Sequence, residues 1–242
     1  MEDNLEKLYE PSQKPIIWVE GIIGCGKTTL TKMISRELNY RAIYEPVNLE
    51  LLEMFYKDQE RWAFAMQIDL LHRRFALQKL GSFESITGKG VVMDRGLPGD
   101  RVFAKMLHTA GKIHDIEWAI YERAYTVMSN SLIPPSLIVY MEVTPEIAQE
   151  RIKERNRKAE QGDLIPLAYL NELEKGYENL LREIASGIPS WSRGMKVVRL
   201  PWNTPEESEN SNKEVIRIIK NLARSIPLDE FFNSINEDLT TP

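Results

Sequence analysis

Short apolar runs bounded by turn residues alternate along this chain with longer segments in which apolar residues recur every three or four positions. The short runs predict β-strands and the longer segments predict helices. The expected strands are residues 16–20, 41–44, 90–94, 137–141 and 195–200. The expected helices are the segment with Leu30, Met33, Ile34 and Leu38, and residues 60–80, 114–128, 145–158, 166–185 and 206–226. This alternation is typical of βαβ units, so we expect an α/β fold with a five-stranded parallel sheet flanked by helices.

Length and composition place the chain among ordinary globular proteins. It has 242 residues, of which 43% are hydrophobic and 28% are charged, and this balance argues against a disordered or membrane-embedded class. No apolar run approaches the roughly 18 residues that a membrane span needs, and the acidic N-terminus is unlike a secretory or transit peptide. We therefore expect one domain over residues 15–227, mobile segments at 1–14 and 228–242, no membrane partner and a cytoplasmic location.

Charge and cysteine content narrow the range of partners. The formal net charge is −5 at pH 7, whereas non-specific nucleic-acid binding depends on lysines and arginines that neutralise phosphates, so we expect no nucleic-acid partner. Cys25 is the only cysteine, which excludes an intrachain disulfide, and the sequence has no Cys/His cluster for a structural zinc site. Any metal ion is expected to have oxygen ligands.

A phosphate-binding motif follows the first expected strand. Residues 21–28 read Gly-Ile-Ile-Gly-Cys-Gly-Lys-Thr and fit G-x-x-x-x-G-K-[ST]. Glycines permit the tight turn and a close backbone approach, and the helix that follows points its positive N-terminal dipole at an anion. The alternative is an ordinary Gly-rich turn, which the placement between a strand and a helix disfavours. The residues expected to hold a nucleotide here are Gly21, Ile22, Ile23, Gly24, Cys25, Gly26, Lys27, Thr28 and Thr29.

Two acidic residues stand at the ends of expected strands. Glu45 precedes Pro46 after the second strand, and Asp94 precedes Arg95 at the end of the third. Ligands bind at the carboxyl edge of an α/β sheet, so both carboxylates are expected to face the phosphate-binding motif. Taken alone, either residue could instead be a turn former or a helix cap. A GTP-dependent switch protein would need an N-K-x-D segment to recognise guanine, and the sequence has none.

Polar side chains interrupt the apolar face of the expected helix 60–80. Gln67 and Arg74 fall on one stripe with Phe64 and Leu71. Such side chains need partners, and either a nucleobase edge or a neighbouring carboxylate would satisfy them. A basic run in the expected helix 145–158 is the second polar feature, and a solvated helix face is its simplest explanation. Its members are Arg151, Lys153, Arg155, Arg157 and Lys158.

Together these residues resemble the deoxynucleoside kinase family, from about residue 15 to residue 226. Besides the phosphate-binding motif, the matching features are Glu45-Pro46-Val47, Tyr56 followed eleven residues later by Gln67, Arg74, Asp94-Arg95, Asp100, and residues 151–162 and 166–170. The resemblance implies a P-loop kinase fold with an arginine-rich lid over about residues 151–164. It also implies ATP and Mg²⁺ as cofactors, and transfer of the γ-phosphate of ATP onto the 5′-hydroxyl of a deoxynucleoside.

On the phosphate side, the resemblance assigns each matching residue a role. Thr28 would hold Mg²⁺ directly, and Asp94 would do so directly or through water. Lys27 and Arg95 would stabilise the transferring charge. The lid arginines would close over the ATP phosphates, because a forked guanidinium matches phosphate oxygens. These arginines are Arg151, Arg155 and Arg157.

On the nucleoside side, Glu45 would accept a hydrogen bond from the 5′-hydroxyl and act as its base. Gln67 would bond the Watson–Crick edge, with Arg74 and Asp100 paired near that edge. Tyr56 and Glu160 would bind the 3′-hydroxyl, and Tyr56 would leave little room for a 2′-hydroxyl. The Arg–Asp pair is the arrangement of members that take cytosine or purines, which implies deoxyadenosine, deoxycytidine or deoxyguanosine rather than thymidine. A homodimer through helices 60–80 and 114–128 is also implied.

The sequence departs from the family pattern after the third strand and in the lid. Asp94-Arg95-Gly96 replaces the usual Glu-Arg-Ser and is followed by Pro98-Gly99, and the lid has Ala159 and two additional residues before Pro166. A nucleoside monophosphate kinase resembling thymidylate kinases is the nearest alternative, since it shares the P-loop, the Glu-Pro and the Asp-Arg. An inactive nucleotide-binding regulatory module is an alternative from another class. The set of Tyr56, Gln67, Arg74 and Asp100 favours a nucleoside kinase.

Overall fold

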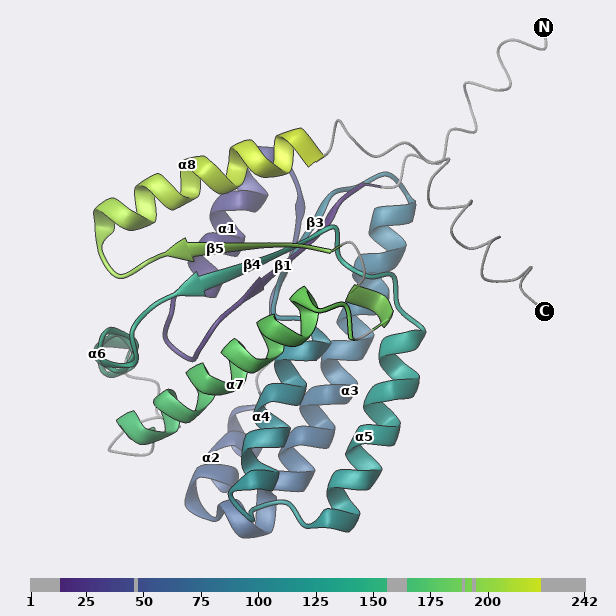
Figure 1. Cartoon of the computed structure of the whole chain (residues 1–242), viewed down its shortest axis with the longest axis vertical. Helices are drawn as coiled ribbons and strands as arrows, with labels where there is room; N and C mark the ends of the chain where they lie inside the picture. Colours follow the sequence, from purple (N-terminus) through teal and green to yellow (C-terminus); the bar gives the residue numbers. More distant parts are fainter. Residues whose placement is uncertain (1–13, 46–47, 156–164, 189, 193–194, 223–242) are drawn as a thin grey trace, which may run out of the picture.

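The computed structural model describes residues 14–45, 48–155, 165–188, 190–192 and 195–222. Within these ranges the chain has an α/β fold, with a parallel sheet between helices (Figure 1). The strands are β1 Ile16–Glu20, β2 Arg41–Ile43, β3 Val91–Asp94, β4 Leu137–Glu142 and β5 Lys196–Pro201. They lie in the order β2-β3-β1-β4-β5, and all pairs are parallel. The predicted strands are confirmed, with ends that differ by at most one residue.

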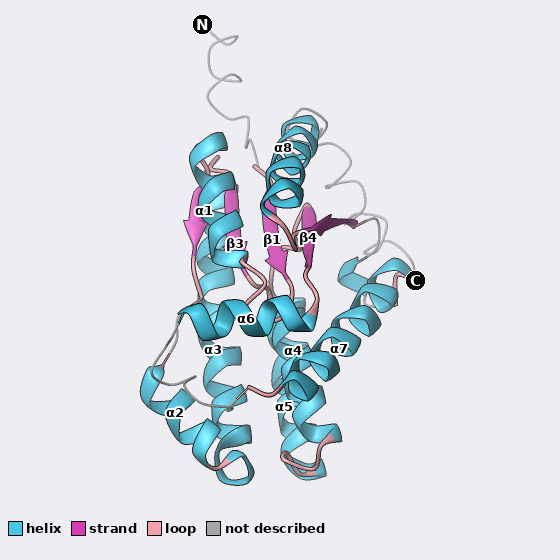
Figure 2. Cartoon of the chain, turned by 90° about the vertical axis from the view of Figure 1, so that its left-hand side faces the viewer, coloured by secondary structure: helices cyan, strands magenta, loops and turns pink. Residues whose placement is uncertain are grey.

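Helices cover both faces of this sheet. α1 Lys27–Leu38 and α8 Pro205–Leu222 pack on one face, while α3 Gln59–Ile86 packs on the other (Figure 1). α4 Leu97–Thr109 lies between α3 and α7 Leu167–Ala185, and α5 Asp115–Asn130 packs outside α3 and α4. α6 Pro145–Arg155 crosses beyond the carboxyl ends of the strands (Figure 2). A 3₁₀ turn, η4 Ser190–Ser192, precedes β5.

Two helices were not expected from the sequence, α2 Leu49–Lys57 and α4. α2 is only nine residues long, too short for its periodicity to be decisive, although the Asn48 side chain caps it by accepting from the Leu51 N–H at 3.2 Å. α4 begins with Leu97-Pro98-Gly99, a sequence that predicts a turn. Proline is tolerated in the first helical turn because the N–H groups there have no partner within the helix.

The sheet is buried because both of its faces are covered. Every residue of β1 and β3 is buried, as expected for parallel strands enclosed by helices. Leu30 and Ile34 of α1 are fully buried against the sheet and pack in the same core as Tyr177 of α7. This core fixes the strand ends, and with them the loops that follow.

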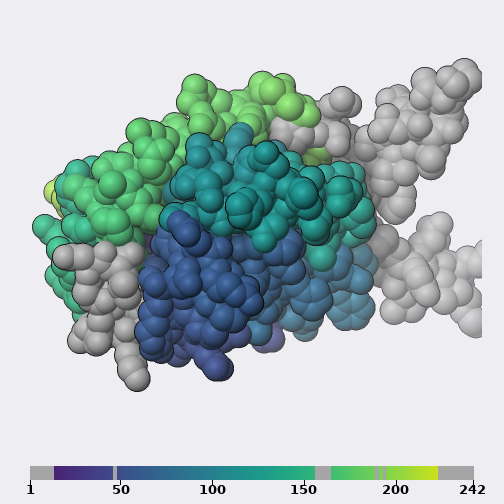
Figure 3. Space-filling model, turned by 90° about the horizontal axis from the view of Figure 1, so that it is seen from below, coloured from purple at the N-terminus to yellow at the C-terminus, as the bar shows by residue number. Residues whose placement is uncertain are grey.

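The carboxyl ends of the strands meet at one edge of the sheet. In register, Val19 lies opposite Asp94, so Glu20 and Arg95 follow side by side where the pairing of β1 with β3 ends. Seen from below, α2 and α3 (blue), α4 and α5 (teal) and α7 (green) form one continuous surface (Figure 3). The topology therefore gathers residues from distant parts of the sequence at the edge where ligands bind.

Some predicted features lie outside the described residues. These are most of the N-terminal segment 1–14, the C-terminal segment 228–242 and residues 156–164 of the expected lid. Lys14 is described, and its backbone N–H donates to the Ser85 carbonyl at 3.2 Å. Among the helices that the structure describes, none is long and apolar enough to cross a membrane.

We predict that Ile34→Ala lowers the free energy of unfolding by about 2–5 kcal/mol, because it leaves a cavity in the core. Ile34 is 0% exposed, so the loss includes both the transfer of the side chain and the void. Urea unfolding followed by circular dichroism measures the change. Ile188→Ala is the matched control, since Ile188 is 75% exposed. Equal losses in the two variants would contradict the assigned core.

Candidate active site

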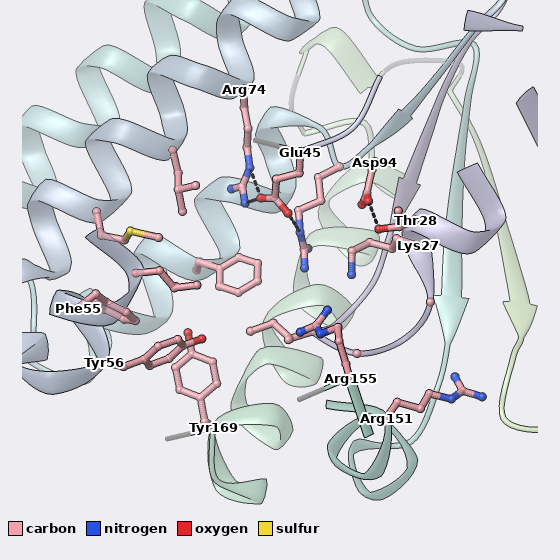
Figure 4. A pocket seen from close by; sticks show the side chains of 18 of the residues that line it. Lys27, Thr28, Glu45, Phe55, Tyr56, Arg74, Asp94, Arg151, Arg155 and Tyr169 are labelled. Carbon is pink, nitrogen blue, oxygen red and sulfur yellow. Dashed lines mark hydrogen bonds and ion pairs between the residues drawn. The ribbon is translucent and has the colours of Figure 1, made fainter. Parts of the chain in front are cut away.

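A cavity of about 490 Å³ opens at the carboxyl edge of the sheet. Its lining comes from the phosphate-binding loop, the ends of β2 and β3, and helices α2, α3, α4, α6 and α7 (Figure 4). The lining residues with charged or amide side chains are Lys27, Glu45, Gln67, Arg74, Asp94, Arg95, Arg151 and Arg155. Most of the residues predicted from the sequence to bind substrate or nucleotide therefore line one cavity.

The phosphate-binding loop has the backbone that its glycines predict. Gly24 and Gly26 have φ values of 82° and 101°, in the left-handed region that residues with a Cβ rarely adopt. A Cβ on Gly24 would lie 2.4 Å from the Ala148 carbonyl oxygen, so the packing of α6 also demands glycine. Gly26 is the N-cap of α1, and no side chain caps that end. The positive end of the helix is therefore directed at the cavity.

Lys27 lies folded against the phosphate-binding loop. Its ammonium group donates to the carbonyl oxygens of Gly21 at 3.2 Å and Ile22 at 2.7 Å. Burial lowers the pKa of Lys27, and the nearby positive charge of Arg95 lowers it further. The side chain is thus a buried cation held by neutral carbonyls, and an anionic ligand would be a stronger partner.

Thr28 and Asp94 form a hydrogen-bonded pair beside the loop. The Thr28 hydroxyl donates to Asp94 Oδ2 at 2.5 Å (Figure 4). The other carboxylate oxygen, Oδ1, is buried without a hydrogen-bond partner among the described residues. A hydroxyl and an unsatisfied carboxylate oxygen at the start of the phosphate-binding helix form a donor set that suits Mg²⁺.

Glu45 is held between two arginines. Its Oε1 accepts from Arg74 Nε at 3.0 Å and also from Arg74 Nη2, while its Oε2 accepts from Arg95 Nε at 3.2 Å (Figure 4). Burial would raise the pKa of Glu45, but Arg74 and Arg95 outweigh burial and lower this pKa to about 2. Glu45 is therefore ionised throughout the neutral range, and it is a weaker base than an ordinary glutamate.

Arg74 connects Glu45 to a second carboxylate deeper in the protein. Its Nη1 donates to Asp100 Oδ1, and Tyr121 donates its hydroxyl to Asp100 Oδ2. Burial raises the pKa of Asp100, although Arg74 opposes the shift. Asp100 is completely buried and lies behind Arg74 rather than on the cavity lining. The predicted Arg74–Asp100 pair is thus present, with Arg74 as the member that reaches the cavity.

The far end of the cavity is largely apolar. Gln67 is buried there, and its Oε1 has no hydrogen-bond partner among the described residues. Tyr56 of α2 and Tyr169 of α7 also line the cavity (Figure 4). The apolar walls, to which the sequence analysis assigned no role, are Leu52, Phe55, Met66, Leu70 and Phe103. An unsatisfied amide in an apolar pocket suits a flat ligand with a polar edge.

The basic residues of α6 lie in two different arrangements. Arg155 points into the cavity, whereas Arg151 points away from its centre (Figure 4). Arg151 donates to the carbonyl oxygens of Trp202 at 2.8 Å, Asn203 at 3.1 Å and Cys25 at 3.3 Å. It therefore ties the phosphate-binding loop to the segment after β5. Arg157 and Glu160 lie outside the described residues.

Sequence reasoning missed several residues that shape this site. Phe103 lies under both guanidinium groups, with centroid distances of 4.8 Å to Arg95 and 5.9 Å to Arg74. Its position could not be inferred because α4 was not predicted. Glu20, in contrast, could have been identified from the sequence, because it is a carboxylate that ends an otherwise apolar strand. Tyr121 and Tyr177 could not have been identified in this way, because tyrosines on helices are usually ordinary core residues.

Comparison with known proteins points to the same class of enzyme. The family model described as deoxynucleoside kinase matches residues 17–224. The deoxyadenosine kinase of Dictyostelium discoideum is 35% identical over 221 residues, which cover 91% of this chain and 82% of the relative. The deoxyadenosine/deoxycytidine kinase of Bacillus subtilis (strain 168) is 36% identical over 177 residues, which cover 72% of this chain and 79% of the relative.

A solved structure has the same fold. The structure of deoxyadenosine kinase from M. mycoides with bound dCTP superimposes with a TM-score of 0.68 and 26% identity, covering 87% of this chain and 100% of that chain. These matches favour a nucleoside kinase over the thymidylate-kinase-like alternative. The family match spans most of the chain and includes the phosphate-binding loop, Glu45 and Asp94-Arg95, and the chain therefore belongs to the deoxynucleoside kinase family.

Proposed function

We propose that this kinase transfers the γ-phosphate of ATP to the 5′-hydroxyl of a deoxynucleoside that has an exocyclic amino group on its base, in nucleotide salvage. The observation that carries the proposal is the position of Glu45, an ionised carboxylate held by two arginines at the junction of the cavity's two ends. The loop with Lys27 forms one end, and the apolar pocket with Gln67 forms the other. A phosphate donor and a nucleoside acceptor fit these two ends.

ATP and Mg²⁺ fit the phosphate end. Lys27 would exchange the carbonyls of Gly21 and Ile22 for phosphate oxygens, since a charged acceptor makes a stronger hydrogen bond. Thr28 and Asp94 would hold Mg²⁺, which supplies countercharge to the β- and γ-phosphates when bound. The unsatisfied Oδ1 of Asp94 supports this assignment. Arg155 points into the cavity, where it would contact the same phosphates.

The acceptor hydroxyl would be oriented by Glu45. With a pKa of about 2, Glu45 is a poor base. Phosphoryl transfer through a loose transition state does not require a strong base, because little negative charge has to develop on the attacking oxygen before the reaction. Its contribution would be to accept the 5′-hydroxyl proton as a hydrogen bond and to point the oxygen at the γ-phosphate. Arg95, which donates to the other side of Glu45, would stabilise the charge that develops on the transferring group.

For the base, we propose deoxyadenosine as the preferred substrate, with deoxycytidine next. Relatives named deoxyadenosine kinase and deoxyadenosine/deoxycytidine kinase support this order. Adenine and cytosine both present an amino donor beside a ring acceptor, which matches the oxygen and NH₂ of Gln67. Asp100 would act through Arg74, which it holds in place. Tyr56, and Glu160 outside the described residues, would bind the 3′-hydroxyl and favour deoxyribose over ribose.

A homodimer is the proposed assembly, through the outer faces of α3 and α5. On α5, Ile116 and Val127 are 77% and 73% exposed, and Phe83 on α3 is 64% exposed. Exposed apolar side chains on adjacent helices are typical of a protein interface. A single domain over 15–227 and a cytoplasmic location remain predictions from the sequence.

We predict that Glu45→Gln lowers kcat at least about 100-fold, because the amide neither carries the charge nor accepts the hydroxyl proton as strongly. The measurement is Mg²⁺-dependent ATP consumption with the four deoxynucleosides, their monophosphates and adenosine. Glu50→Gln, at an exposed position of α2, is the matched control. Turnover of monophosphates alone would contradict the proposed function, and wild-type kcat in Glu45→Gln would contradict the role of this residue.

We predict that Gln67→Leu lowers kcat/KM for deoxyadenosine by about 10- to 100-fold, because the base edge then faces an apolar side chain. Gln78→Leu is the matched control, since Gln78 is also a buried glutamine of α3 but does not line the cavity. Steady-state assays with each deoxynucleoside check both variants. Should thymidine have the highest kcat/KM in the wild type, the proposed base preference would be wrong.

We predict that the double variant Ile116→Asp, Val127→Asp is monomeric at concentrations where the wild type is dimeric, because a charge in an apolar interface must lose its water. Light scattering after size-exclusion chromatography gives the mass of each species. Ile188→Asp, at another exposed apolar position, should leave the dimer intact. A monomeric wild type across the micromolar range would overturn the assembly.

A further inference from the structure

Glu20 is a buried carboxylate with no role in the proposed chemistry. It ends β1 immediately before Gly21 of the phosphate-binding loop and is only 2% exposed. A buried charge is retained only where other groups satisfy it, because its transfer from water is costly. The groups that satisfy Glu20 therefore indicate what it does.

Each oxygen of Glu20 has its own hydrogen bond. Oε1 accepts from the Gly96 backbone N–H at 2.6 Å, and Oε2 accepts from the Tyr177 hydroxyl at 2.9 Å. Arg95 Nη1 lies 3.8 Å from Oε2, at ion-pair distance. The same Nη1 donates to the Tyr177 hydroxyl and, at 3.0 Å, to the Gly21 carbonyl. Glu20 and Tyr177 thus hold one end of the Arg95 guanidinium, while its Nε faces Glu45 at 3.2 Å.

The backbone at Arg95 also depends on Glu20. Arg95 has a φ of 74°, a left-handed conformation that is uncommon for a residue with a long side chain and persists only where surrounding contacts enforce it. The next peptide N–H, at Gly96, is the one that Glu20 accepts. Glu20 therefore restrains the backbone of Arg95 directly and its side chain through Tyr177.

Two glycines after Arg95 make room for this arrangement. A Cβ on Gly99 would lie 2.5 Å from Glu20 Oε2, and a Cβ on Gly96 would lie 2.6 Å from the Trp18 ring. Larger residues at either position would displace the carboxylate or the strand beneath it. Gly96 and Gly99, two of the residues that set this sequence apart from the family pattern, are thus accounted for by the nearby Trp18 ring and Glu20 carboxylate.

We propose that Glu20 and Tyr177 are positioning residues, which act on phosphoryl transfer only by holding the Arg95 guanidinium between the phosphate-binding loop and Glu45. The inference rests on the proposed role of Arg95 in charge stabilisation. Neither Glu20 nor Tyr177 lines the cavity, so neither touches substrate. Loss of either restraint changes the orientation of Arg95 at the moment when charge develops, and affects substrate binding much less.

The test is Tyr177→Phe, which keeps the ring and its packing but removes the hydroxyl. We expect kcat to fall about 10- to 100-fold, with KM for deoxyadenosine and for ATP within about threefold of wild type. Tyr140→Phe is the matched control, because it removes the same atom from a buried tyrosine whose ring centroid is 5.6 Å from that of Tyr177. The control should keep wild-type kcat. Glu20→Gln, which keeps the size of the side chain and loses its charge, is the second variant should Tyr177→Phe fail to fold.

A double-mutant cycle with Arg95→Lys separates positioning from a general effect on structure. If Tyr177 and Glu20 act through Arg95, then Tyr177→Phe or Glu20→Gln lowers kcat by less than about twofold in the Arg95→Lys background. If the kcat losses of the single variants multiply in the double variants, this inference is overturned and the proposed function is not. The same holds if both single variants have a wild-type kcat while Arg95→Lys is impaired. A wild-type kcat in Arg95→Lys would remove the proposed role of Arg95 and overturn the inference with it.

Discussion

The charge balance around Glu45 is the interaction on which the rest of the site depends. Two buried guanidinium groups, of Arg74 and Arg95, converge on this one carboxylate. Each arginine also has a second carboxylate partner: Asp100 pairs with the other end of the Arg74 guanidinium, and Glu20 lies at ion-pair distance from the other end of the Arg95 guanidinium. Removing one partner of such a buried ion pair would be strongly destabilising, because it leaves the other charge uncompensated. The alternation of acidic and basic groups therefore fixes the positions of these charges beside the cavity.

The arrangement also explains how one cavity serves two ligands. Strands β1 and β3 and helix α1 build its phosphate end, where backbone N–H groups and Lys27 favour anions. Helices α2, α3 and α4 build the other end from apolar side chains around Gln67. Glu45 follows β2 and lies where these ends meet, so alignment between donor and acceptor follows from the packing of α3 and α4 against the sheet.

Glycine is needed where another group approaches the backbone too closely for a Cβ atom. Gly24 lies against the Ala148 carbonyl and Gly99 lies against Glu20. The second contact links α4 to the end of β1, and the hydrogen bond between Tyr177 and Glu20 links β1 to α7. The position of Arg95 is thus a property of three elements, not of its local sequence.

The sequence alone determined the parallel sheet, the phosphate-binding loop and the family, because strand periodicity and the spacing of glycine, lysine and threonine are local patterns. It also singled out Glu45, Gln67, Arg74 and Asp94, whose residue types are unusual at strand ends or on an apolar helix face. Only the tertiary structure decided what these side chains contact. Helix α4 was not predicted because it begins with Pro98-Gly99, and the position of Phe103 on that helix was therefore not predicted either. The links of Glu20 to Tyr177 and of Asp100 to Tyr121 join residues 157 and 21 positions apart, and contacts of that kind arise from packing, which has no period in the sequence.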